Sequence, residues 1–212
     1  LDKDEWQRER QVILEELKMY EDMPRMWVSD MLETTMFNLQ MGVIGNRETI
    51  NAIDSKDMRD LIDKWYVPGN TVISVAGGVS RKEVVEFSER FFGERKGSTR
   101  KTRAPELPSK SKQMVIDQAR QTDQVNLAIG FRAFGMENED AAALRLLGDI
   151  LGGKMSSRLF TEVREKRGLA YSVSASPQTY TDSGYVALRA GVALEKAKEA
   201  TKVILAEAAR MK

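Results

Sequence analysis

Two residue types that build many catalytic and metal sites are missing from this chain of 212 residues, which contains no cysteine and no histidine. Without cysteine, disulfides and thiolate metal sites are excluded. Without histidine, the chain lacks the commonest zinc ligand and the commonest general base. A metal site built from this chain alone would consist of carboxylates, carbonyls and waters, which suit magnesium or calcium better than zinc.

Long apolar runs and an excess of one charge are also missing. No run approaches the roughly 18 residues that a membrane span needs, and no signal peptide is visible. The net charge is only +1, so no global field favours nucleic acid or an acidic substrate. We therefore expect no nucleic-acid partner and no membrane partner. The absence of cysteine is compatible with a reducing compartment, so we expect a cytoplasmic location, with a mitochondrial location as the alternative.

What remains is a globular composition, with 42% hydrophobic and 31% charged residues. The chain begins at Leu1 and enters helical sequence almost at once. Its last residues are helix-like and carry no glycine or proline stop signal. We therefore expect a portion of a longer protein.

The first half of the chain is dominated by helical patterns. Residues 5–23 form one amphipathic pattern that ends before Pro24. More helix is expected after Pro24, interrupted near Gly42 and Gly45. Ser55 is a candidate N-cap for a later helix, and Ser80 with Glu83 forms a candidate capping box for another. The β-branched, apolar stretch from 71 to 76 predicts a buried strand.

A basic, proline-containing segment, residues 95–112, predicts a linker between two halves. A nucleic-acid-binding arm is the alternative, but the segment has no interleaved aromatic residues. The second half alternates strands and helices and predicts an α+β fold, with a largely antiparallel sheet packed with helices. The expected strands are residues 113–117, 124–131, 169–174 and 185–190, and the expected helices are 138–151, 155–166 and a last one from about Leu194.

Two carboxylates lie on the apolar side of the first helical pattern. Glu9 and Glu16 are separated by two helical turns and differ by only about 20° around the helix axis. Trp6 and Leu17 are among the apolar residues that flank them, whereas Glu15 lies on the opposite, polar side. A carboxylate on a buried face is costly unless it is paired or binds a metal, so we expect both to point toward the interior or a cleft. A salt bridge to an arginine and a metal ligand both satisfy this pattern.

The segment from Arg8 to Glu16, RERQVILEE, resembles the glutamate-bearing helix of the pitrilysin/insulinase family, the inverted zincins. In that family, an upstream H-x-x-E-H helix supplies two histidine ligands and a general-base glutamate; this helix is absent here. The stretch from Phe37 to Val43 is also shorter than usual and lacks the family's His-Pro. Further resemblances cover most of the chain: Ile44–Ile50, Trp65–Asn70, Ala76–Val79, Leu151–Phe160 and Arg164–Tyr171.

The resemblance implies that Glu16 is the third zinc ligand and that Glu9 is the family's second acidic position. It also implies that Arg164 and Tyr171 bind the substrate near the scissile peptide, where a cation and a phenol can stabilise an oxyanion. Without the family, Arg164 near a helix C-terminus and Tyr171 in a strand are ordinary residues. The implied domains are residues 1–94, the C-terminal half of the zinc-site domain, and 113–212, part of the second domain.

The resemblance implies a zinc metallopeptidase that acts on peptides, with zinc bound only in the complete protein and this chain inactive alone. A homodimer or a heterodimer with a related subunit fits the family. One rival is a non-catalytic scaffold or binding subunit of the same fold. The other rival is an unrelated α+β interaction domain.

Overall fold

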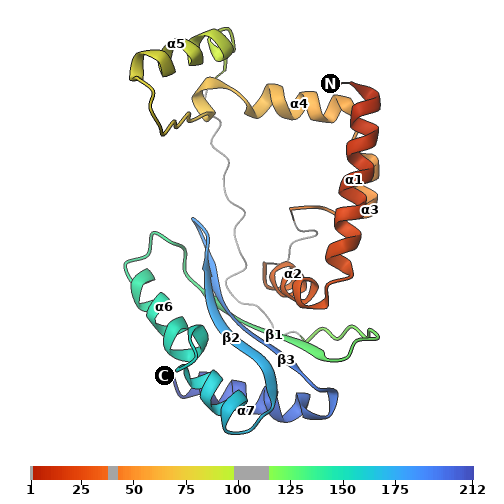
Figure 1. The fold of residues 1–212 in the computed structure, drawn as a ribbon, viewed down its shortest axis with the longest axis vertical. Helices are drawn as coiled ribbons and strands as arrows, with labels where there is room; N and C mark the ends of the chain where they lie inside the picture. The colour runs from red at the N-terminus through yellow and green to blue at the C-terminus, as the bar shows by residue number, and fades with distance from the viewer. Residues whose placement is uncertain (1, 38–42, 98–114) are drawn as a thin grey trace. The chain divides into compact units, whose positions relative to one another are not determined.

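The computed structural model describes residues 2–37, 43–97 and 115–212 (Figure 1). Contacts divide the chain into two compact units, residues 1–15 with 47–105 and residues 16–46 with 106–212. The described elements, with η for 3-10 and π helices, are α1 (Lys3–Glu21), α2 (Pro24–Phe37), α3 (Arg47–Ala52), α4 (Ser55–Trp65), η1 (Pro68–Asn70), α5 (Arg81–Phe92), β1 (Val125–Ala133), α6 (Ala141–Gly148), η2 (Asp149–Gly153), η3 (Phe160–Glu165), β2 (Ala170–Thr179), β3 (Gly184–Val192), η4 (Leu194–Lys196) and α7 (Ala197–Ala209).

These elements confirm the predicted α+β class with antiparallel strands. The predicted peptidase-domain boundaries divide the chain by sequence resemblance, not by contacts, and they stay a prediction. Most of the predicted linker and most of the short segment from Phe37 to Val43 lie outside the described residues.

Capping side chains set the starts of two helices in the first unit. The predicted box is present at α5, where Ser80 Oγ accepts the Glu83 N–H at 3.3 Å and the Glu83 carboxylate accepts the Ser80 N–H at 2.8 Å. The predicted N-cap at Ser55 is wrong by one residue. Asp54 caps α4, because its carboxylate accepts the Asp57 N–H at 3.0 Å while the Asp57 side chain accepts the Asp54 N–H at 2.9 Å. An aspartate with this reciprocal bond is a stronger cap than the serine beside it.

The predicted buried strand at residues 71–76 is not formed. Val72 is 91% exposed, Val75 is 54% exposed, and no residue of this stretch is in a strand. A strand needs a neighbour to pair its N–H and C=O groups, and the described residues of the first unit contain no strand. The β-branched pattern is present, but its pairing partner is not among these residues.

The second unit is built on a three-stranded antiparallel sheet in the order β1-β3-β2. β3 is central: Leu188 lies opposite Ile129 of β1 on one side and Ala175 of β2 on the other. The three strands confirm the predictions at 124–131, 169–174 and 185–190 and extend each of them. The predicted strand at 113–117 is wrong for its described part, since residues 115–117 are in no strand.

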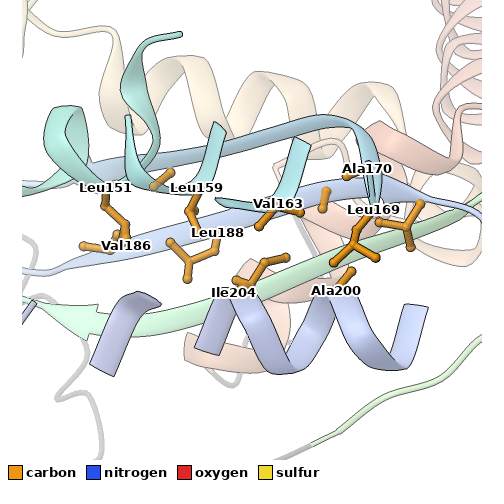
Figure 2. Packing of buried hydrophobic residues seen from close by; sticks show 12 residues of the cluster. Leu151, Leu159, Val163, Leu169, Ala170, Val186, Leu188, Ala200 and Ile204 are labelled. Atoms are coloured by element: carbon orange, nitrogen blue, oxygen red, sulfur yellow. The ribbon is translucent and has the colours of Figure 1, made fainter. Parts of the chain in front are cut away.

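The core of the second unit lies on one face of this sheet, under η2, η3 and α7 (Figure 2). Alternate residues of β3, including Leu188 and Val192, point to this face and are almost fully buried. Leu159 and Val163 reach them from the segment around η3, and Ile204 reaches them from α7. The helix that carries Arg164 is therefore seated on the sheet that carries Tyr171. Within the described residues, no helix is both long and apolar enough to cross a membrane.

Candidate functional site

Arg164 is packed against two aromatic rings in the second unit. Its guanidinium carbon lies 4.9 Å from the ring centroid of Phe160 and 5.4 Å from that of Tyr171. Such cation–π contacts stabilise the pair by about 0.5–1 kcal/mol at an exposed site and fix the plane of the guanidinium. Stacked faces leave the N–H groups at the edge of the guanidinium, and no acceptor among the described residues bonds to them. The predicted pair of Arg164 and Tyr171 is thus brought together, with donors available to a ligand.

The local backbone explains this geometry. Gly168 adopts φ +56°, and its N–H and that of Leu169 donate to the carbonyls of Arg164 and Val163 at 3.1 and 2.9 Å. This left-handed turn ends the helix at the predicted place and returns the chain into β2 within two residues. Arg164 at a helix end and Tyr171 on the next strand are confirmed as predicted.

A β-bulge aims the tyrosine. Ala170 pairs with Val192 and Ser172 pairs with Gly191, so Tyr171 is the extra residue of β2. Bulges re-aim a side chain out of the regular alternation. Tyr171 is accordingly 82% exposed, next to Arg164 rather than in the core.

Glu162, two residues before Arg164, is paired with two other cations. Glu162 accepts hydrogen bonds from Arg167 at 2.5 Å and Lys166 at 2.6 Å. The Arg167 bond, and after it the Lys166 bond, lowers the pKa of Glu162 from its usual 4.5 to about 2. Glu162 is thus paired with Arg167 and Lys166, while Arg164 stacks on Phe160 and Tyr171.

Glu9 and Glu16 lie on α1, as expected, but both side chains are exposed. Within the described residues neither side chain is buried in an interior, and the expectation that they face a cleft stays a prediction. The apolar arc around them is only partly covered: Val12 is 49% exposed, Ile13 is partly buried, and Leu17 is the buried residue of this helix. The helix period determines which residues share a face, but only a packing partner buries that face.

The residues of this chain do not fit a complete zinc site. Catalytic zinc usually has three protein ligands and an open position, and the sequence supplies neither histidine nor cysteine. In the described part of the chain, no three acidic residues come close enough together to hold a metal ion. Glu16 and Glu9 remain predicted as one ligand and its acidic neighbour.

Sequence reasoning missed two features that support the site. The ring of Phe160 stacks on the Arg164 guanidinium. Its position four residues before Arg164 on a helix could have predicted this contact. The second feature is a buried ion pair between Arg158, just before η3, and Glu207 of α7, with N···O distances of 2.9 and 2.7 Å. No sequence pattern links residues that far apart.

A family model described as "Peptidase M16 inactive domain" matches residues 52–212. The uncharacterized zinc protease YmxG of Bacillus subtilis is 34% identical over 216 residues, covering 100% of this chain and 52% of that protein. The uncharacterized zinc protease SCO5738 of Streptomyces coelicolor is 34% identical over 205 residues, covering 92% of this chain and 44% of that protein. The chain thus spans about half the length of these relatives.

Solved structures show the same fold. A peptidase M16 inactive domain from Pseudomonas fluorescens superposes with a TM-score of 0.82 at 22% identity, covering 99% of this chain and 52% of that one. A protease from Helicobacter pylori superposes with a TM-score of 0.80 at 23% identity, covering 97% and 52%. At these identities the likeness shows the fold alone.

Proposed function

Because this chain belongs to the peptidase M16, or pitrilysin/insulinase, family, we propose that it is part of a zinc-dependent metalloendopeptidase that hydrolyses peptides. Relatives that share about a third of its residues are named zinc proteases, which supports the proposal. Family membership also removes the rival of an unrelated α+β interaction domain.

The pairing of Arg164 with the exposed Tyr171 carries this proposal. The guanidinium edge and the phenol O–H are donors at the same helix–strand corner, where the guanidinium carbon lies 5.4 Å from the ring centroid of the exposed Tyr171. Donors placed in this way can hold a peptide carbonyl and stabilise negative charge that develops on its oxygen. In the complete protein, Glu16 would serve as a zinc ligand and Glu9 as its acidic neighbour.

The substrate roles are tested by kinetics of the complete protein encoded by the gene. Tyr171→Phe removes one donor and is expected to lower kcat/KM by about 10²-fold, with bound zinc unchanged. Arg164→Met is expected to have a comparable effect, whereas Glu16→Gln is expected to lower the zinc content itself. Tyr66→Phe, an exposed tyrosine of the first unit, is the matched control. Full activity of both Tyr171→Phe and Arg164→Met would overturn the substrate assignment.

The 212-residue chain alone is expected to hydrolyse no peptide through zinc, because it offers one predicted ligand and one acidic neighbour. The assay adds zinc to the purified chain and follows cleavage of an unstructured peptide. Turnover that a chelator abolishes, and that Glu16→Gln removes, would show this expectation to be wrong.

A second candidate function is a non-catalytic scaffold or binding subunit. The matching family model is itself described as an inactive domain, and one chain of the same fold belongs to Complex III2 from Candida albicans. An H-x-x-E-H sequence upstream in the gene favours the enzyme; its absence, with no zinc bound to the complete protein, favours the scaffold. A homodimer or a heterodimer with a related subunit is proposed for either function.

A further inference from the structure

The sheet of the second unit has two unlike faces. One face carries the apolar side chains of the core, such as Leu188. The register places small and polar residues on the other face, among them Gly130, Ala187, Arg189 and Ser176. Helix α2 packs on this second face.

The apolar part of this contact is close. Leu32 and Met36 of α2 pack with the buried cluster of Phe37, Tyr185 and Ala187. The ring of Phe37 meets that of Tyr185 edge-on, with centroids 5.7 Å apart. A Cβ atom added at Gly130 would come within 2.1 Å of Met36 Sδ and 3.0 Å of Leu32 Cδ1, so the glycine makes room for the helix.

Polar bonds then fix the helix along the sheet. Arg189 donates from Nε to Ser29 Oγ of α2 and from Nη1 to Ser176 Oγ of β2, both at 2.9 Å. At the end of α2, Arg132 of β1 donates to the carbonyl of Met36. Arg189 therefore ties the middle of α2 to two strands through one guanidinium.

The end of α1 is held by the same unit. Arg120 donates to the carbonyl of Glu21, the last residue of α1, and its guanidinium lies 5.3 Å from the ring of Trp27. Trp27 donates to Gln118 at 2.6 Å. Two residues separate α1 from α2. Across this junction the backbone N–H of Trp27 donates to the backbone carbonyl of Met23 at 3.0 Å. A displacement of α2 would therefore carry the end of α1 with it.

Glu16 lies less than two turns before that end and groups with the unit that carries Arg164 and Tyr171. We propose that the docking of α2 on the polar sheet face positions Glu16 relative to the Arg164–Tyr171 pair, and that Arg189 is a positioning residue. The inference rests on the proposed function for its catalytic meaning, but the docking itself is tested separately.

The first experiment uses the absence of cysteine, which allows pairwise labelling without background. Nitroxides at Lys18→Cys on α1 and Lys198→Cys on α7 report the distance from the Glu16 helix to the sheet. Labels at Arg145→Cys and Lys198→Cys form a reference pair between α6 and α7. We expect a narrow distance distribution by double electron–electron resonance for both pairs in the otherwise unchanged chain.

Gly130→Val and Arg189→Met are expected to shift and broaden the first distribution and leave the reference unchanged. Arg189→Lys keeps a donor and is expected to restore most of the narrow peak. If a sheet variant disturbs the reference pair, Leu32→Ala combined with Met36→Ala tests the contact from the α2 side alone. An unchanged first distribution in this α2 variant, or in Gly130→Val with Arg189→Met, would overturn the proposal.

The second experiment measures peptide hydrolysis by the complete protein. Misplacing Glu16 by about 1 Å relative to the Arg164–Tyr171 pair is expected to lower kcat about ten- to hundredfold while KM changes little. Arg189→Met should show this split with rescue by Arg189→Lys, and Arg145→Met should not. If Arg189→Met lowers the yield of soluble protein but leaves kcat and KM of the remaining protein unchanged, Arg189 has a merely structural role. If the complete protein hydrolyses nothing, the proposed function fails, while the distance measurement still decides the docking.

Discussion

The buried ion pair beneath the site gives a sharp prediction about stability. Glu207 is 4% exposed and accepts bonds from Arg158 on one oxygen, at 2.9 and 2.7 Å, and from Arg210 on the other, at 2.9 Å. Removing one partner of a buried pair costs about 3–5 kcal/mol, because the other charge is left without compensation. The two partners are not equivalent here, since the Arg158 side chain is 36% exposed and that of Glu207 only 6%.

Arg158→Met leaves the buried Glu207 with Arg210 as its remaining partner, and the Arg210 side chain is 67% exposed. We therefore expect most of that cost, about 3–4 kcal/mol of unfolding free energy. Glu207→Leu leaves two arginines, Arg158 and Arg210, that water reaches, so we expect a smaller cost of about 2–3 kcal/mol. The double variant leaves only Arg210, whose side chain is 67% exposed, without its carboxylate, and replaces Arg158 and Glu207 by apolar groups. It should therefore be more stable than Arg158→Met alone.

Urea unfolding followed by circular dichroism measures these free-energy differences. In thermal unfolding, Arg158→Met should lower the Tm by about 10 °C. Arg145→Met, an exposed arginine of α6, is the control and should change the unfolding free energy by less than about 0.5 kcal/mol. If the double variant loses the sum of the two single losses, Arg158 and Glu207 are not coupled and the reasoning is refuted.

Two further predictions concern the corner that carries the site. Gly168→Ala should cost about 1–2 kcal/mol of unfolding free energy, because Gly168 has φ +56°. The added Cβ meets no described atom within 4 Å, so the cost is backbone strain alone. Urea unfolding in which Gly168→Ala is as stable as the unchanged chain would contradict this prediction. Glu162 has a pKa lowered to about 2 in the folded protein, so its ionised carboxylate stabilises the fold above the unfolded pKa. This stabilisation is lost as the pH falls from about 4.5 toward 2. As the pH is lowered across that window, the unfolding free energy of Glu162→Gln should fall less steeply than that of the unchanged chain. An identical slope for the two proteins would show that the ion pair does not contribute.

Local patterns in the sequence determined several parts of this protein. The Ser80–Glu83 box, the stop at Gly168 and the three strands of the second unit were predicted because each depends on neighbours in the chain or on the period of two. The family resemblance named Arg164 and Tyr171 together, and a short turn joins the helix end and the strand that carry them. Motifs of this kind also carried the family resemblance, because a family keeps the residues that its local geometry needs.

Tertiary contacts decided the rest. The wheel of α1 placed Glu9 and Glu16 on one face, but it carried no information on whether a partner covers that face, and both side chains are exposed. The apolar stretch at 71–76 had the pattern of a strand, yet a strand exists only where another lies beside it. The docking of α2 through Gly130 and Arg189, and the pair of Arg158 with Glu207, join residues from about fifty to a hundred and sixty positions apart. Such contacts arise from packing and charge pairing in three dimensions, which a period along one chain does not encode.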